Sequence, residues 1–170
     1  MSNEVAAKSW PKNFQFAYHA GGAGAPVTIW KDVKSGAKVA WGAPVKLDDD
    51  EVEAMTDGDA TDIFGIALAP GNGDADYALD NHEDGGKKIP IAVATPQNVF
   101  VGQCKGATNA LNLPMTCDID ITSDQYYVDE GSTTNDQIRI IARVEEDDAT
   151  DTSDPPRVYF VLDSSNQSFL

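Results

Sequence analysis

The sequence predicts an all-β fold with minor helix, built as one small β-barrel or sandwich-like domain. From residue 27 onward the apolar residues fall in short runs separated by Gly, Pro, Asn and Asp, and no long stretch keeps a 3.6-residue period. Hydrophobic residues make up 41% of a chain of 170 residues, which is enough for the core of a single domain. Many short strands of this kind are typical of a β-barrel or a β-sandwich.

Residues 1–26 are predicted to form an extended N-terminal arm and a glycine-rich hinge. Residues 14–18 have the alternation of a strand, which places Phe14, Phe16 and Tyr18 on one side. Residues 20–26 carry almost no side chain that could pack, as is typical of a flexible hinge. The hinge is expected to separate the arm from a single β-rich domain, residues 27–170.

Further strands are predicted within this domain from short apolar runs bounded by turn residues. They span residues 27–31, 38–41, 45–47, 63–68, 89–94, 99–103, 118–122, 137–144 and 157–162. The last two carry apolar side chains on both faces, so we expect them to be covered on both sides. Residues 50–55 and 108–113 are each predicted to make a turn or two of helix, the second capped by Thr108 and ended by Pro114.

The charge is divided unevenly along the chain. The net charge is −16, but residues 1–46 hold six lysines against Glu4 and Asp32, a balance of +4 that leaves −20 for the remainder. An acidic body is repelled by phosphate backbones and anionic lipids, so we expect neither nucleic acid nor membrane as a partner. Residues 1–11 contain no apolar stretch of the kind that marks a secretory signal, so we expect synthesis in the cytoplasm.

The sequence contains none of the common catalytic motifs, such as Gly-x-Ser-x-Gly, His-Glu-x-x-His or the phosphate-binding loop. His19 and His82 have no nucleophile placed beside them to activate, and acidic residues are so numerous that a carboxylate pair carries no information. Cys104 and Cys117 lack the spacing of a zinc site and are expected to be buried, reduced thiols. We therefore expect a protein that is not an enzyme and has no cofactor.

Two acidic, glycine-bearing runs leave calcium binding open as an alternative. Residues 57–62 and 72–76 place oxygen-bearing side chains at alternate positions, but neither run completes an EF-hand. Ile63 and Leu68 stand where the first run would need further ligands. We therefore predict no metal site and interpret both runs as solvated acidic surface.

The three tryptophans, Trp10, Trp30 and Trp41, leave a second alternative, stacking on sugars. Trp30 and Trp41 occur within strand-like runs, where tryptophan is more often a core or subunit-contact residue. The alternative function is thus an acidic, β-rich surface or fibre-associated module that binds calcium or glycan.

Three segments of the central block share a recognisable pattern: Gly42-Ala-Pro-Val-Lys-Leu, Asp62-Ile-Phe-Gly-Ile-Ala-Leu and Lys88-Ile-Pro-Ile-Ala-Val-Ala-Thr-Pro-Gln-Asn-Val-Phe. The block, which covers residues 36–103, resembles the head decoration (cement) proteins of tailed bacteriophages. Weaker support comes from the two strands around Ile138 and Val158. The resemblance implies a small β-tulip-like domain that assembles, commonly as a trimer, on the outer surface of the capsid and clamps neighbouring major capsid subunits.

From this resemblance we expect a structural virion protein whose partners are the major capsid protein and further copies of itself. The expected contact residues lie on the arm, where two lysines flank a tryptophan and aromatic residues alternate: Lys8, Trp10, Lys12, Phe14, Phe16 and Tyr18. An extended, amphipathic arm of this kind is suited to strand addition at a partner's sheet edge.

Overall fold

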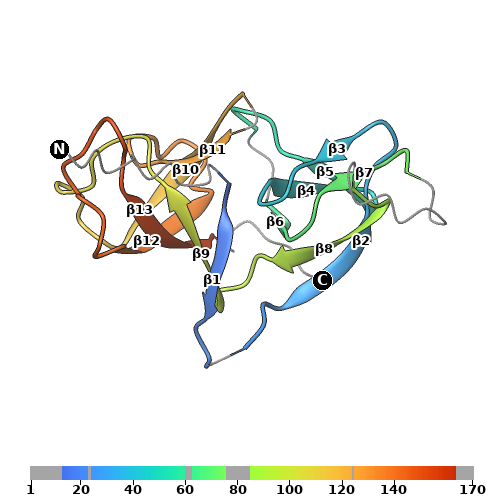
Figure 1. The fold of residues 1–170 in the computed structure, drawn as a ribbon, viewed down its shortest axis with the longest axis horizontal. Coiled ribbons are helices and arrows are strands. Elements are labelled where there is room, and N and C mark those ends of the chain that lie inside the picture. The colour runs from blue at the N-terminus through green and yellow to red at the C-terminus, as the bar shows by residue number, and fades with distance from the viewer. Residues whose placement is uncertain (1–12, 23, 60–62, 76–84, 124, 164–170) are drawn as a thin grey trace, which may run out of the picture.

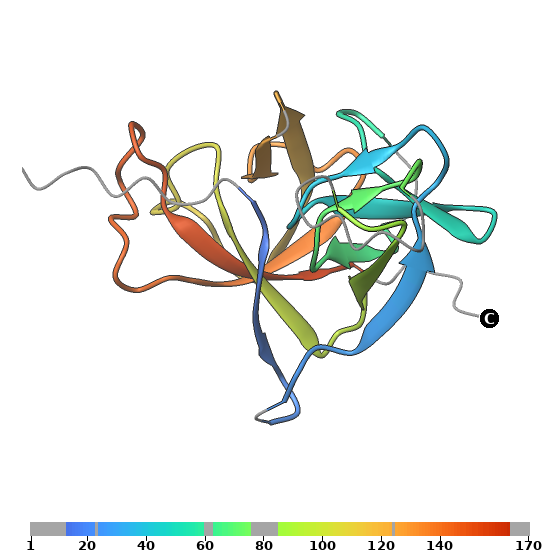
Figure 2. The same cartoon turned by 45° about the vertical axis from the view of Figure 1, so that its right-hand side comes forward.

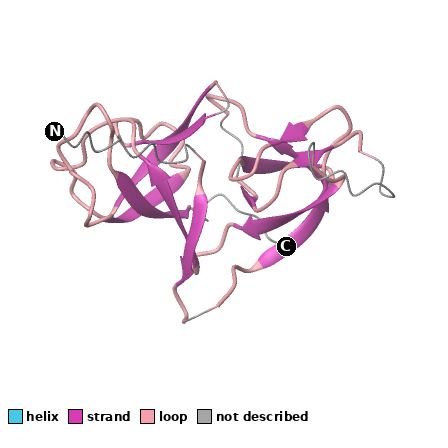
Figure 3. Cartoon of the chain, in the orientation of Figure 1, coloured by secondary structure: helices cyan, strands magenta, loops and turns pink. Residues whose placement is uncertain are grey.

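The structure is a computed structural model that describes residues 13–22, 24–59, 63–75, 85–123 and 125–163. This part of the chain is all-β and contains no helix (Figure 3). The strands are β1 (Gln15–His19), β2 (Thr28–Asp32), β3 (Lys38–Val39), β4 (Pro44–Asp48), β5 (Glu51–Ala54), β6 (Gly65–Ala67), β7 (Gly71–Asn72), β8 (Lys88–Val93), β9 (Asn98–Gln103), β10 (Met115–Thr122), β11 (Gln125–Asp129), β12 (Ile138–Arg143) and β13 (Arg157–Leu162). The predicted all-β fold is confirmed.

The strands form two main sheets that lie side by side as the two halves of the body (Figures 1 and 2). Sheet A has the order β1-β9-β13-β12-β10-β11, sheet B has the order β2-β8-β6-β4-β5, and β3 and β7 form a separate pair. All the strand pairs are antiparallel. Buried residues of both sheets belong to one hydrophobic cluster, which includes Phe100 and Phe160 from sheet A and Ile66 and Ile91 from sheet B.

One long antiparallel pairing runs through both sheets and joins them at a corner. β1 pairs with β9 in sheet A, β2 pairs with β8 in sheet B, and only residues 94–97 separate β8 from β9. The buried side chain of Asn98 fastens this corner, because Val27 N donates to Asn98 Oδ1 at 3.0 Å while Asn98 Nδ2 donates to Val27 O at 3.1 Å. The same amide nitrogen also donates to Val93 O at 2.8 Å.

In each sheet the last outer strand also bridges a segment from the other side of the sheet, without closing a barrel. In sheet B, Val33 forms a single parallel bridge with Val52, and Lys34 N donates to Val52 O at 2.9 Å. In sheet A, Cys104, the residue that follows the inner strand β9, forms a single parallel bridge with Val128 of the outer strand β11. The described residues therefore form two curled, open sheets in a sandwich-like arrangement and not a closed barrel, which decides between the two architectures that the sequence left open.

Each predicted strand overlaps an observed one, whereas both predicted helical segments are wrong. Residues 51–54 form strand β5, which pairs with β4 so that Val52 lies opposite Leu47 and is fully buried. Residues 108–113 form turns that Arg143 holds in place, with Nε donating to Thr108 O at 2.8 Å and a terminal nitrogen donating to Leu111 O at 2.7 Å. Strands β5, β7 and β11 were not predicted.

Candidate functional site

The second half of the predicted arm lies inside the body. Phe14 is only 1% exposed, and its ring centroid lies 4.9 Å from that of Phe160 and 6.1 Å from that of Tyr126. Gly102 makes this position possible, since a Cβ there would lie 2.6 Å from Phe14 Cδ1. Burying a phenylalanine contributes about 1.5–3 kcal/mol that a free arm would forgo. The predicted boundary at residue 26 is therefore corrected, because residues 14–19 belong to the folded body.

The predicted contact residues consequently separate into groups. Three of them lie outside the described residues: Lys8, Trp10 and Lys12. Phe14 is in the core, and Phe16 packs against the core with its ring edge-to-face at 6.3 Å from Phe100. Tyr18 is 45% exposed and lies against Tyr159, with ring centroids 5.9 Å apart. Among the described members, Tyr18 thus offers the most surface to a partner.

An exposed apolar segment begins at the corner and continues along β2, an outer strand of sheet B (Figure 1). Val27 is 45% exposed, Ile29 is 40% exposed and Trp30 is 59% exposed. Thr28 is also exposed, whereas the two residues that end the strand are half-buried. The sequence left Trp30 as a core or subunit-contact residue, and the structure places it on the surface.

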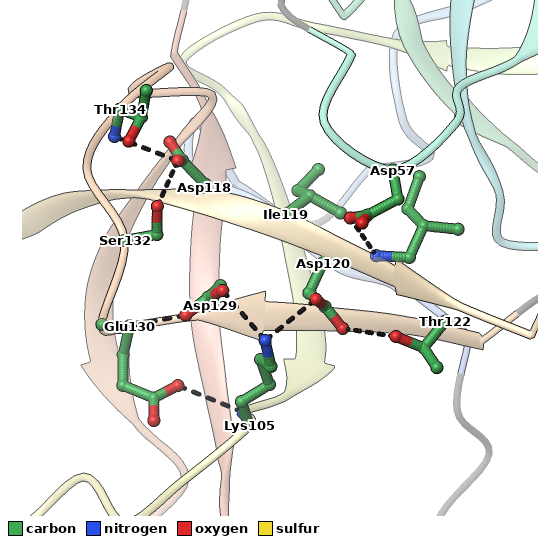
Figure 4. Close-up of polar contacts among 12 residues, drawn as sticks. Asp57, Lys105, Asp118, Ile119, Asp120, Thr122, Asp129, Glu130, Ser132 and Thr134 are labelled. Carbon is green, nitrogen blue, oxygen red and sulfur yellow. Dashed lines mark hydrogen bonds and ion pairs between the residues drawn. The ribbon is translucent and has the colours of Figure 1, made fainter.

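A polar cluster organises the loop between β11 and β12 (Figure 4). The Asp118 carboxylate is 6% exposed and accepts a hydrogen bond from Ser132 Oγ at 2.6 Å. Three consecutive backbone N–H groups also donate to it at 2.8–3.0 Å: Thr134, Asn135 and Asp136. Burial acts to raise the pKa of Asp118, but these hydrogen bonds outweigh it and hold that pKa below its ordinary value.

Lys105 lies beside this cluster and joins β10 to β11 through ion pairs. Its Nζ lies 2.9 Å from Asp120 Oδ1 and 3.2 Å from Asp129 Oδ2, and these hydrogen-bonded contacts raise the pKa of Lys105. The Lys105 backbone N–H donates to Glu130 Oε2 at 3.1 Å, while burial raises the pKa of Glu130. The arrangement ties the two strands to the end of β9.

The acidic runs considered for calcium are engaged by donors of the protein itself. Asp59 pairs with Lys46 Nζ at 2.5 Å, and Asp57 accepts a hydrogen bond from Ile121 N at 3.3 Å. Asp74 accepts hydrogen bonds from Gly36 N at 2.8 Å and Ser35 Oγ at 3.0 Å, which lower its pKa. Residues 60–62 and 76 lie outside the described residues. In the part of the chain that the structure describes, no three His, Cys, Asp or Glu side chains group as metal ligands.

A shallow acidic cavity of about 210 Å³ lies in the loop between β12 and β13. Its wall includes Arg157, whose guanidinium forms a two-point contact with Asp147 at 2.9 and 3.0 Å. Asp148 accepts hydrogen bonds from Thr150, and Asp151 accepts them from Ser153. These carboxylates therefore shape the loop from within.

The two cysteines are buried and free, so the prediction of buried thiols is confirmed. Burial raises the pKa of Cys104 and raises that of Cys117 to about 12, which keeps both thiols protonated and weakly nucleophilic at neutral pH. His19 lies on β1 and accepts a hydrogen bond from Gly21 N at 3.2 Å, whereas His82 is outside the described residues. Within the described ranges no helix is long and apolar enough to cross a membrane.

No protein-family model matches the chain, and no curated protein or solved structure is significantly similar to it. The interpretation of its function therefore depends on its own residues and on the central block described above.

Sequence reasoning missed the role of two residues that the structure makes prominent. In the sequence, Asn98 stands out only as part of the third segment of the central block, and Asp118 only as the first residue of a predicted strand. A buried amide or carboxylate that binds distant backbone groups leaves no local pattern, since its partners, such as the N–H groups of Val27 and Thr134, are set by the fold.

Proposed function

We propose that this protein is a structural virion protein that binds the outer surface of a phage capsid and stabilises it by clamping neighbouring major capsid subunits. The observation that carries the proposal is the placement of the three segments of the central block. They contain β4, β6 and β8, which are consecutive neighbours in sheet B in the order β8-β6-β4. The three segments thus lie side by side in sheet B although they are separated in the sequence, and the end of the third continues past the corner into β9 of sheet A.

Two further properties of the body suit a protein that is displayed in many copies. Its loops are held by internal hydrogen bonds to carboxylates, as at Asp118, Asp147 and Asp151. The net charge of −16 on the whole chain keeps closely spaced copies soluble through mutual repulsion. Many copies of such a rigid, acidic body can add contacts to a capsid surface without aggregating with one another.

The proposed mechanism is mass action. A protein that binds the assembled lattice, but not the dissociated subunits, stabilises the lattice in proportion to its occupancy. Contacts that are individually weak add up when several copies are joined. The N-terminal segment with Lys8, Trp10 and Lys12 is proposed to supply part of the adhesion, because aromatic residues with flanking cations are effective contact residues.

The experiment is co-sedimentation with capsids assembled from the major capsid protein of the same genome in the absence of this chain. The truncation should remove residues 1–12 and no more, because Phe14 belongs to the core. We expect the full chain to sediment with capsids and the 13–170 fragment to stay folded but lose most of its binding.

A matched pair of double variants separates a specific role of the arm from a general effect of charge. Lys8→Ala with Lys12→Ala removes two positive charges from the segment, and Lys38→Ala with Lys88→Ala removes two from exposed positions of the body. The first pair should weaken binding more than the second. A full chain that never sediments with capsids would refute the proposal, whereas a 13–170 fragment that binds normally would refute only the arm's role.

A further inference from the structure

The outer strands of the two main sheets differ in how well they are protected against pairing with another chain. β1 is interrupted by a bulge between Phe16 and Tyr18. β5 carries Glu51 and Glu53 and is partly covered by the bridge from Val33 to Val52. β11 is held at Val128 by the bridge from Cys104 and by the hydrogen bond from Lys105 N at 3.0 Å. Bulges, charges and covering segments are the usual protections of a sheet edge.

Among the residues that the structure describes, none gives the first part of β2 any of these protections. Its pairing with β8 is regular from Thr28 to Asp32. Val93 N donates to Val27 O at 3.1 Å and Val33 N donates to Lys87 O at 2.7 Å, which sets the alternation of the ladder. Since hydrogen-bonded positions alternate in an antiparallel pair, the N–H and C=O groups of Thr28 and Trp30 point away from β8.

The apolar side chains of this segment lie on both faces of the edge. Val27 and Ile29 share one face and Trp30 lies on the other, because successive residues of a strand alternate. All three are exposed. A partner that lay flat on one face would cover only part of them, whereas an added strand would cover both faces.

We propose that residues 28–30 of β2 pair antiparallel with the same residues of a second copy, across a twofold axis at Ile29. In this register Thr28 lies opposite Trp30 of the other copy on both sides of the axis, so every outward N–H and C=O of these two residues finds a partner. Ile29 lies opposite itself in the closely spaced type of pair. The five-stranded sheet B of each copy would then continue into the other.

The net charge of the chain opposes self-association in general, but the residues at the centre of this edge suit a second copy and this register. The three central residues are uncharged, in a chain of net charge −16, so the copies meet where there is no carboxylate to repel. A shift of the axis to Lys31 or Asp32 would set like charges opposite each other, which destabilises a strand pair. It would also meet the start of β5, since Lys31 Nζ lies 3.0 Å from Asp50 Oδ1.

The area of the exposed apolar segment limits the strength of the contact between two copies. Its three exposed apolar side chains offer roughly 300 Å² per copy, whereas a stable specific interface buries about 800 Å² per partner. The pairing is therefore a weak self-association that depends on concentration and becomes effective where copies are crowded. It does not depend on the proposed function, because it follows from β2 alone.

The test is sedimentation equilibrium of the full chain over a wide concentration range. The mass should rise from the monomer value of 18.2 kDa toward twice that value. Trp30→Lys should weaken the association by about tenfold or more, because a charge at the edge opposes pairing. Trp41→Lys is the matched control, since Trp41 is 42% exposed and lies outside β2, and it should leave the association unchanged.

A cross-link tests the register without relying on loss of an interaction. Ile29→Cys should form an intermolecular disulfide rapidly under mild oxidation, because closely spaced antiparallel pairs have Cα atoms about 4.5 Å apart, within disulfide range. Leu47→Cys, at a residue of β4 that is 43% exposed, should cross-link much more slowly.

A chain that stays monomeric at all concentrations would overturn the pairing. So would a stable trimer that Trp30→Lys does not affect, or equal cross-linking at residues 29 and 47. Capsid binding by a strictly monomeric chain would overturn the pairing and leave the proposed function standing. A chain that dimerises through β2 but never binds capsids would support the pairing and overturn the proposed function.

Discussion

The corner amide provides the sharpest test of how the two sheets are joined. Asn98 is fully buried, and Asn98→Ala removes one acceptor and two donor contacts, those with Val27 N, Val27 O and Val93 O. Val27 O keeps its hydrogen bond from Val93 N at 3.1 Å, so the main cost falls on Val27 N and Val93 O. A buried polar group that loses its partner costs about 1–3 kcal/mol, and Val27 is partly reached by water.

We therefore expect Asn98→Ala to lower the free energy of unfolding by about 2–4 kcal/mol, a large part of the 5–15 kcal/mol typical of a domain. In urea the midpoint should fall by roughly 1–2 M at an unchanged slope. The matched control is Asn109→Ala at an exposed asparagine, which should change the free energy by less than about 0.5 kcal/mol.

Asn98→Asp adds a test that depends on the direction of the hydrogen bonds. An ionised carboxylate keeps the acceptor for Val27 N but faces the carbonyls of Val27 and Val93 with no donor. Its folded-state pKa should therefore be raised, so this variant should be less stable than Asn98→Ala at neutral pH and recover as the pH falls through that raised pKa. Equal stability of Asn98→Ala and Asn109→Ala, or no pH dependence in Asn98→Asp, would refute the role given to this amide.

Two further predictions follow from buried groups elsewhere in the body. Asp118→Asn should lower the free energy of unfolding by about 1–3 kcal/mol, and the exposed control Asp50→Asn, whose side chain is 99% accessible, should lower it by less than about 0.5 kcal/mol. The folded pKa of Asp118 lies below its ordinary value of 3.8, so the loss of stability in Asp118→Asn should be fully present above pH 3.8 and shrink as the pH falls through the folded pKa. Urea titrations at several pH values measure this loss. A loss that grows in acid would contradict the stabilising role of the ionised Asp118. Phe14→Ala should cost about 3–5 kcal/mol in the same titrations, since it leaves a cavity between Tyr126 and Phe160, whereas removal of residues 1–12 should leave the midpoint of the body nearly unchanged. If Phe14→Ala lowered the free energy of unfolding only slightly, residues 14–18 would be better described as the free arm that the sequence predicts.

The positions of most strands could be predicted because their signal is local. In β12 and β13 the buried residues recur at every second position, as at Ile138, Ile140, Val158 and Phe160, and this pattern can be read directly from the sequence. β5 was mistaken for helix because Glu, Ala and Met all favour helix and no glycine marks a turn before it. The turn is made instead by Asp49 at a positive φ of 53°, a conformation that aspartate tolerates better than most residues.

The connections between strands could not be predicted, because they depend on residues far apart in the chain. The same alternation of Phe14, Phe16 and Tyr18 suits a free arm that adds to a partner and an outer strand of the body. Whether this segment is a free arm or an outer strand is decided by β9, whose Val101 pairs with Gln15, and by the space that Gly102 leaves. Local periodicity contains no information about either.

The predicted contact residues on the arm stay a prediction, since three of them lie outside the described residues and, of the others, Tyr18 is the one on the surface. The exposed apolar edge that we propose for pairing lies further along the chain, at residues 28–30, and the corner at Asn98 explains why. Pairing with β9 occupies β1, and the Asn98 amide then holds Val27 at the start of β2, so that the outward groups of Thr28 and Trp30 project from a fixed edge. Because β2 is paired with β8 along its whole length, the edge is already in the extended conformation that strand addition requires, and a partner need not pay for ordering it. Any weak contact made there gains from this rigidity, which links the buried amide to the surface that it positions.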